Sequence, residues 1–121
     1  PVDENIERTA IREAQEEIGI KSLDINIIGS LTDIYIPPSF YWVKPVVSFM
    51  EYKPSFFPDQ KEVDKIYEID YRDIESNKKM INTTVKVGKL KVKTKAYEVQ
   101  DQIIWGATAL MIAELNHILQ N

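Results

Sequence analysis

The chain has 121 residues, of which 44% are hydrophobic and 28% charged, a balance typical of a folded globular domain rather than a disordered chain. Its 19 acidic and 15 basic residues give a net charge of −4, which argues against a general nucleic-acid or anionic-membrane binder. The lack of cysteine excludes disulfides and thiolate sites, and no apolar run approaches the length of a membrane span. We expect a cytoplasmic protein with a single domain over residues 1–121 whose start lies upstream of Pro1, because a strongly patterned helix begins within a few residues.

The first predicted element is a helix over residues 5–18. Asn5 is suited to cap its start, because the side-chain oxygen accepts a hydrogen bond from a free backbone N–H of the first turn. Gly19 is placed to end the helix, because glycine enters the left-handed conformation without a Cβ clash. An apolar stripe at helical spacing runs along the segment: Ile6, Ala10, Ile11, Ala14 and Ile18.

The middle of the chain is rich in β-branched and aromatic residues, which favour strands. Two strands are predicted over residues 23–36 and 40–52, the first bent at Gly29. Pro45 is expected at an edge or a bulge, because proline has no N–H to donate to a sheet. A third strand is predicted over residues 63–71.

The last third of the chain predicts a short polar turn or helix over residues 72–77, a hairpin and a final helix. The apolar residues stand at odd-numbered positions just before Gly88-Lys89 and at even-numbered positions just after it. This change places a tight turn at Gly88-Lys89 inside a hairpin over residues 83–99. A helix is predicted over residues 107–119, with one apolar face formed by Ala107, Leu110, Met111, Leu115 and Ile118. The order of helix, strands and helix predicts an α/β fold in which helices pack on a mixed sheet.

Three carboxylates share one face of the first helix, because Glu13, Glu16 and Glu17 stand at i, i+3 and i+4. Like charges at this spacing repel, and Mg²⁺ or Mn²⁺ would relieve the repulsion because hard cations prefer carboxylate oxygens. Arg12 lies beside Glu13 and four residues before Glu16, where its guanidinium can orient a carboxylate, and Glu4 could fold back toward Arg12. The alternative interpretation is a solvated acidic helix face, which charge runs on helices usually form.

The whole pattern of residues 4–20 resembles the Nudix box, which requires Glu, seven residues, then Arg-Glu-aliphatic-any-Glu-Glu-any-Gly-aliphatic. Six fixed positions match, and by chance this occurs on the order of 5 × 10⁻⁸ times per start position at ordinary residue frequencies. The matching residues are Glu4, Arg12, Glu13, Glu16, Glu17 and Gly19, with Ala14 and Ile20 at the aliphatic places. The first glycine of the box would stand three residues upstream of Pro1.

The resemblance implies a Nudix-type α/β/α sandwich, with its first strands upstream, and a metal-dependent pyrophosphohydrolase. Nudix hydrolases cleave nucleoside diphosphates linked to another moiety. In such an enzyme Glu13, Glu16 and Glu17 would bind Mg²⁺ or Mn²⁺, and one carboxylate would deprotonate the attacking water. Arg12 would hold Glu13 in place, and Glu4 would support this pair without binding the metal itself.

A narrower resemblance links three segments to the coenzyme A pyrophosphatases of the Nudix superfamily: residues 39–47 (SFYWVKPVV), 57–63 (FPDQKEV) and 97–109 (YEVQDQIIWGATA). Such enzymes split coenzyme A into 3′,5′-ADP and 4′-phosphopantetheine. One alternative is a Nudix hydrolase of ADP-ribose, NADH or another nucleoside diphosphate derivative. Another is a Nudix-like domain that senses a nucleotide without hydrolysing it. The expected partner is a small nucleoside diphosphate rather than a nucleic acid or a membrane, and a homodimer is left open.

Two further features have both a functional and an ordinary interpretation. Glu62 would be an accessory carboxylate near the metal, or a surface glutamate in a charged loop. The hairpin carries a basic stripe that would attract the 3′-phosphate of coenzyme A, whereas the more usual role of such a stripe is a solvated outer face. Its members are Lys86, Lys89, Lys91, Lys93 and Lys95.

Overall fold

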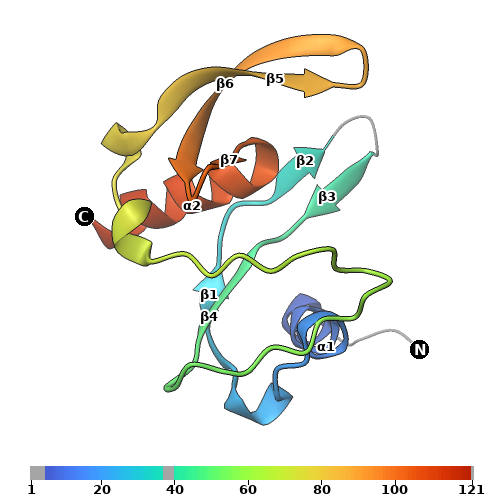
Figure 1. The fold of residues 1–121 in the computed structure, drawn as a ribbon. Coiled ribbons are helices and arrows are strands. Elements are labelled where there is room, and N and C mark those ends of the chain that lie inside the picture. Colours follow the sequence, from blue (N-terminus) through green and yellow to red (C-terminus); the bar gives the residue numbers. More distant parts are fainter. Residues whose placement is uncertain (1–4, 37–39, 121) are drawn as a thin grey trace. The chain divides into compact units, whose positions relative to one another are not determined.

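The computed structural model describes residues 5–36 and 40–120, and Figure 1 shows their helices and strands. The chain divides into two compact units, residues 1–67 and residues 68–121. Among the described residues, the first unit contains one α-helix and two small sheets, and the second contains a three-stranded sheet and one α-helix. Both units therefore combine helices with strands, which confirms the predicted α/β class, while the single-domain organisation stays a prediction.

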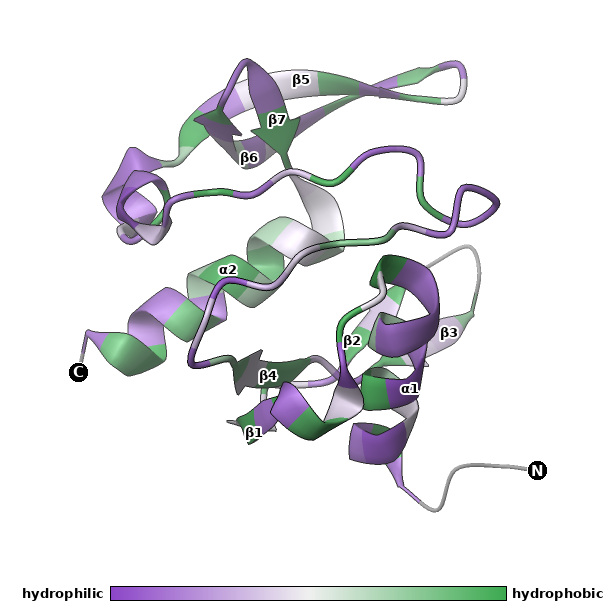
Figure 2. Cartoon of the chain, turned by 60° about the horizontal axis from the view of Figure 1, so that its bottom comes forward, coloured by the Kyte–Doolittle hydropathy of each residue, from purple (hydrophilic) through white to green (hydrophobic). Residues whose placement is uncertain are grey.

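Helix α1 (Ile6–Ile18) forms where the sequence predicts it, with Asn5 as its N-cap. The Asn5 side-chain oxygen accepts a hydrogen bond from the Arg8 N–H at 2.8 Å. Most of the helix ribbon is hydrophilic (Figure 2). Its apolar residues Ala10, Ile11 and Ala14 line a cavity of about 120 Å³ together with residues of β1 (Asn26–Ser30) and β4 (Val46–Phe49). From Ala10 onward the apolar stripe thus lies toward this sheet, which leaves most charged residues of α1 exposed and Glu17 half-buried.

The two long strands predicted for the first unit are each divided. A short 3₁₀ helix, η1 (Ser22–Asp24), precedes β1, and the antiparallel pairing of β1 with β4 shifts register between Ile27 and Gly29. This irregularity confirms the bend expected at Gly29. A second antiparallel pair joins β2 (Ile34–Ile36) to β3 (Tyr41–Val43).

Pro45 lies between β3 and β4, where the missing N–H costs no ladder hydrogen bond. Its carbonyl oxygen accepts a hydrogen bond from the Leu31 N–H at 2.9 Å, and both residues are buried. The break in the predicted strand over residues 40–52 therefore follows from proline chemistry, and the edge or bulge position expected for Pro45 is close to the observed one.

The strand predicted over residues 63–71 is wrong. Residues 63–70 form no strand, and none of the described strands pairs with them, so their backbone groups lack the ladder that a strand needs. Asp70 instead caps a 3₁₀ helix, η2 (Tyr71–Asp73), by accepting a hydrogen bond from the Arg72 N–H at 2.9 Å. The Arg72 guanidinium also lowers the pKa of Asp70 to about 2. A further 3₁₀ helix, η3 (Asn77–Lys79), completes the short polar segment that the sequence predicts.

The sheet of the second unit has the order β5-β6-β7, with both pairs antiparallel. The hairpin of β5 (Ile81–Val87) and β6 (Leu90–Val99) turns at Gly88 and Lys89 as predicted, with Gly88 at φ 60°. Strand β7 (Gln102–Ile104) pairs only with the end of β6, at residues 97–99. Residues 81–96 of the hairpin are therefore a two-stranded extension of the sheet.

Helix α2 (Gly106–Leu119) contacts β6, and the core between them contains Tyr97, Val99 and Ala109. The apolar face predicted for this helix is only partly correct, because Ala107, Met111 and Leu115 are half-buried. Leu110 is 60% exposed, whereas Asn116 is completely buried. Figure 2 shows the reason: α2 is largely hydrophobic except for bands in its second half, so apolar periodicity does not select one face. In the described ranges, 5–36 and 40–120, neither helix combines the length and apolarity needed to cross a bilayer.

Candidate functional site

The acidic residues singled out by the sequence lie on the second half of α1. Glu13 and Glu16 are exposed and Glu17 is half-buried. The Nη1 atom of Arg12 lies 3.4 Å from Oε1 and 3.3 Å from Oε2 of Glu16, so one guanidinium nitrogen faces both carboxylate oxygens. This is the pairing that their i, i+4 spacing allows. The contact of Arg12 with Glu13 implied by the family resemblance stays a prediction, and Glu4 lies outside the described residues.

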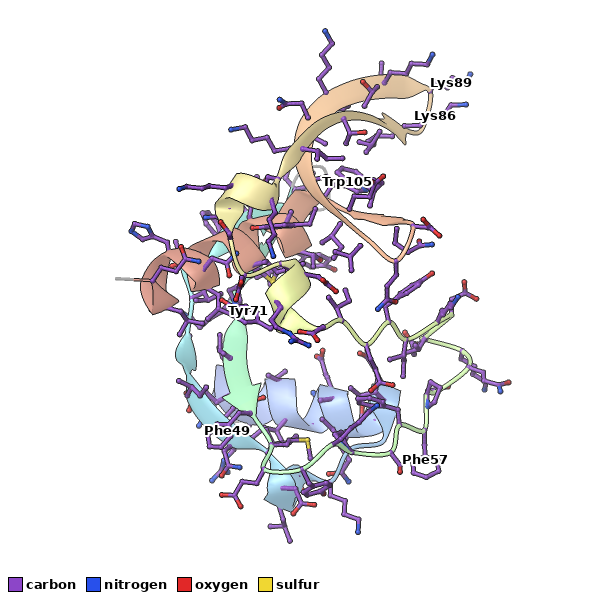
Figure 3. The ribbon with its side chains drawn as sticks, turned by 60° about the vertical axis from the view of Figure 1, so that its left-hand side comes forward. Phe49, Phe57, Tyr71, Lys86, Lys89 and Trp105 are labelled. Carbon is purple, nitrogen blue, oxygen red and sulfur yellow. The ribbon has the colours of Figure 1, made fainter. Side chains whose placement is uncertain are left out.

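A loop of the same unit runs along the end of α1. The Phe57 N–H donates to the Ile18 carbonyl oxygen at 2.9 Å, and the Asp59 N–H donates to the Glu17 carbonyl oxygen at 2.8 Å. These two bonds satisfy carbonyls that a helix terminus leaves without partners. Figure 3 labels Phe57 on this loop. The backbone of one acidic residue of α1 is therefore fixed by a segment forty residues further along the chain.

Asp59 organises the turn that carries Glu62. Its carbonyl oxygen accepts hydrogen bonds from the Glu62 N–H at 3.0 Å and the Val63 N–H at 2.8 Å, and its carboxylate accepts one from the Lys61 N–H at 3.0 Å. Since Asp59 also binds the backbone of Glu17, the turn brings Glu62 into the neighbourhood of the acidic helix. This positioning role was not predicted from the sequence, although an aspartate followed by polar residues is a common turn signal.

A family model of the NUDIX domain matches residues 2–85. The chain belongs to the NUDIX domain family. The match spans the acidic helix and the loop at its end, so the superfamily predicted from residues 4–20 is confirmed, and the α/β architecture is consistent with the Nudix fold.

Two relatives show how much of a longer Nudix hydrolase the chain matches. The Nudix hydrolases named NudL, described as uncharacterized, from Yersinia pestis (strain Pestoides F) and Yersinia pseudotuberculosis (serotype O:1b, strain IP 31758) are each 27% identical to this chain over 115 residues. The alignment covers 95% of this chain and 57% of each relative. The chain thus spans little more than half the length of the curated relatives that it matches.

The glycine of the Nudix box, Gly19, is required here by backbone geometry. It ends α1 in the left-handed conformation, with φ 78°, and its N–H donates to the Gln15 carbonyl oxygen at 3.1 Å. A Cβ at this position would lie 2.8 Å from the Phe57 Cβ and 2.9 Å from the Phe57 carbonyl oxygen. The loop therefore approaches α1 so closely only because residue 19 has no side chain.

Replacing Gly19 by alanine should lower the free energy of unfolding by about 2–4 kcal/mol, since the left-handed conformation and the clash with Phe57 both oppose a side chain. Urea denaturation of the two proteins measures this difference. Gly29→Ala is the matched control, because a Cβ at Gly29 meets no atom within 4 Å. Equal losses for the two variants would contradict the explanation from close approach.

The donor chemistry at α1 fits a hard divalent cation. Among residues 5–36 and 40–120, no group of three or more histidine, cysteine, aspartate or glutamate side chains is arranged to hold a metal ion. Mg²⁺ commonly binds through only one or two carboxylates and takes its other ligands from water and substrate phosphates. Glu13 and Glu16 are exposed and carry suitable oxygens, so a ligand set completed by a diphosphate is compatible with this helix.

Proposed function

We propose that the protein is a divalent-metal-dependent Nudix pyrophosphohydrolase, and that its substrate is coenzyme A or a coenzyme A derivative, split into 3′,5′-ADP and 4′-phosphopantetheine. The observation that carries the proposal is the intact set of Arg12, Glu13, Glu16 and Glu17 on a helix whose end is fixed by the loop at residues 57–59. We propose the cytoplasm as its location and Mg²⁺ or Mn²⁺ as its ion.

Each residue of the set has a role in this proposal. Glu13, Glu16 and Glu17 are the proposed metal ligands, of which one or two would hold the ion together with phosphate oxygens of the substrate. The ion, when bound, would neutralise the diphosphate and lower the pKa of a bound water. Arg12 would keep the Glu16 carboxylate in one orientation through the ion pair at 3.3 Å. A carboxylate of α1, or Glu62 from the adjacent turn, would accept the proton of the attacking water. Glu4 would support Arg12.

The substrate is tested with the full-length protein. Coenzyme A, ADP-ribose and NADH are each incubated with Mg²⁺ or Mn²⁺, and the products are resolved by chromatography. We expect 3′,5′-ADP and 4′-phosphopantetheine from coenzyme A and much slower turnover of the other two. Preferred cleavage of ADP-ribose or NADH would retain the hydrolase and replace the substrate. Tight nucleotide binding without any product would instead indicate a sensor.

A further inference from the structure

The hairpin of β5 and β6 has one face with an unusual charge distribution. Directly opposite residues of an antiparallel pair share a face, and the register pairs Asn82 with Lys95, Thr84 with Lys93 and Lys86 with Lys91. We call these six residues the lysine face. All six are exposed, and the face holds four cations and no acid.

The arrangement of these charges is unfavourable for the hairpin alone. Lys86 and Lys91 lie directly opposite each other, where Cβ atoms are about 5 Å apart and like charges destabilise the pair. Lys89 adds another cation in the turn, and Figure 3 shows Lys86 and Lys89 at the tip of the hairpin. Within residues 5–36 and 40–120, no ion pair joins an acid to any of these lysines. An ordinary solvated strand face carries both acidic and basic side chains. The lysine face carries only basic ones, so it lacks the negative charges that would balance them.

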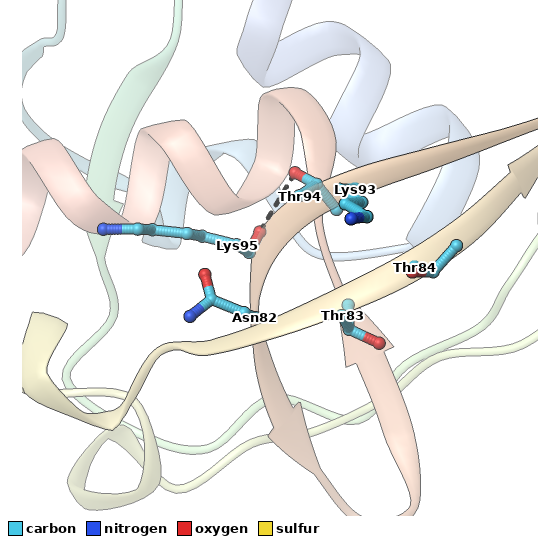
Figure 4. Close-up of a pocket in the computed structure, with 6 residues that line it drawn as sticks. All are labelled: Asn82, Thr83, Thr84, Lys93, Thr94 and Lys95. Atoms are coloured by element: carbon cyan, nitrogen blue, oxygen red, sulfur yellow. Dashed lines mark hydrogen bonds between the residues drawn. The ribbon is translucent and has the colours of Figure 1, made fainter.

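An open hollow of about 520 Å³, a volume in the range of small-molecule sites, lies along the same stretch of the hairpin and is lined by four residues of the lysine face and by the Thr83–Thr94 pair between them. The six residues that line it carry polar side chains, although most of the surface that they turn toward it belongs to carbon atoms. They are drawn in Figure 4: Asn82, Thr83, Thr84, Lys93, Thr94 and Lys95. The ammonium groups supply positive charge, while the amide and hydroxyl groups supply neutral hydrogen-bond donors. This combination matches a phosphate group, which carries negative charge on several acceptor oxygens.

We propose that this hollow binds a phosphate group of a small anionic ligand, with Lys93 and Lys95 as the cations and Asn82 and Thr84 as hydrogen-bond donors. The net charge of −4 favours a small ligand over a large polyanion. A nucleic acid or membrane extends over many residues and meets the acidic surface as well, whereas the field of the hollow is screened beyond about 8–10 Å. The inference rests on the hairpin and holds whether or not the proposed hydrolase activity does.

Titration of the ¹⁵N-labelled full-length protein tests the proposal. The probes are 3′,5′-ADP and inorganic phosphate, with adenosine as the ligand that lacks phosphate, and divalent metal is omitted so that binding at the carboxylates of α1 is not measured. We expect both phosphate probes to shift the amide resonances of residues 82–84 and 93–95, and adenosine to leave them unchanged. A response to 3′,5′-ADP much stronger than that to inorganic phosphate would identify an organic phosphate as the ligand.

A matched pair of variants separates the site from the overall charge. K93Q/K95Q should weaken the binding of 3′,5′-ADP about tenfold, because two charged contacts are lost. K61Q/K78Q removes the same charge from exposed lysines outside the hairpin and should change the affinity less than about twofold. Equal weakening in both variants would overturn the proposal. So would the absence of any shift, or binding only to vesicles of phosphatidylcholine with phosphatidylserine.

Discussion

Replacing Asn116 by leucine should lower the free energy of unfolding by about 3 kcal/mol, a large part of the stability of a small protein. The Asn116 side chain is completely buried in the second unit, where an unpaired polar group cannot turn to water. Leucine has a similar volume but cannot donate or accept a hydrogen bond. Urea denaturation, with hydrogen exchange at the amides of β6 and α2, measures the loss.

The cost arises from the partners that Asn116 leaves behind. Its Nδ2 donates to the Ile74 carbonyl oxygen at 2.7 Å and to the Asn77 Oδ1 at 3.1 Å, and its Oδ1 accepts from the Tyr71 hydroxyl at 2.7 Å. The Tyr97 hydroxyl donates to the same Asn77 oxygen at 2.6 Å. Burial raises the pKa of Tyr97, which keeps this hydroxyl protonated as a donor. The network therefore ties η2, η3 and β6 to α2.

A double-mutant cycle separates the network from simple packing. Tyr71→Phe alone removes the donor to Asn116, whereas in the Asn116→Leu background the Tyr71 hydroxyl has already lost that acceptor. We therefore expect the two losses to be less than additive by about 0.5–1 kcal/mol. Asn82→Leu, on the exposed hairpin, is the control and should change stability by no more than about 0.5 kcal/mol. Additive losses would show that the hydrogen bond at 2.7 Å contributes nothing.

Local signals in the sequence were sufficient for some elements and insufficient for others. The limits of α1 and the turn at Gly88 depend on residues that act on their own neighbours, so capping and turn chemistry predict them. The segment over residues 63–70 has loose alternation, but a strand also depends on a partner that no local pattern supplies. The buried face of α2 depends in the same way on β6, and an asparagine in its core is contrary to the usual preference.

The candidate site likewise contains residues that local sequence spacing predicts and residues whose role depends on tertiary contacts. The shared helix face of the acidic set was predictable from the sequence, because a helix converts sequence spacing directly into position on one face. The set consists of Arg12, Glu13, Glu16 and Glu17. The role of Asp59 was not predictable, because its importance comes from hydrogen bonds to Glu17 and Glu62 that form only once the loop folds back on α1. The box glycine lies between these cases: Gly19 was predicted as a helix end, whereas its close approach to Phe57 required the three-dimensional arrangement.

Glu16→Gln is expected to lower turnover of the proposed substrate by at least about a hundredfold, because glutamine keeps the shape of the side chain but loses the charge that a metal ligand or base requires. The fold should be little affected. The ion pair with Arg12 joins side chains that are 48% and 60% exposed, and such pairs contribute about 0.2–1 kcal/mol. A change in stability under about 1 kcal/mol would therefore separate lost chemistry from lost structure.

Two further measurements make this result specific to the site. Binding of Mn²⁺ without substrate, followed by electron paramagnetic resonance, should weaken in Glu16→Gln. Glu7→Gln is the control, because Glu7 is an exposed acid in the first turn of the same helix and lies outside the Nudix pattern. It should retain both turnover and Mn²⁺ affinity. Full activity of Glu16→Gln, or equal losses in the two variants, would mean that the acidic face of α1 is a solvated surface and that the metal site lies elsewhere.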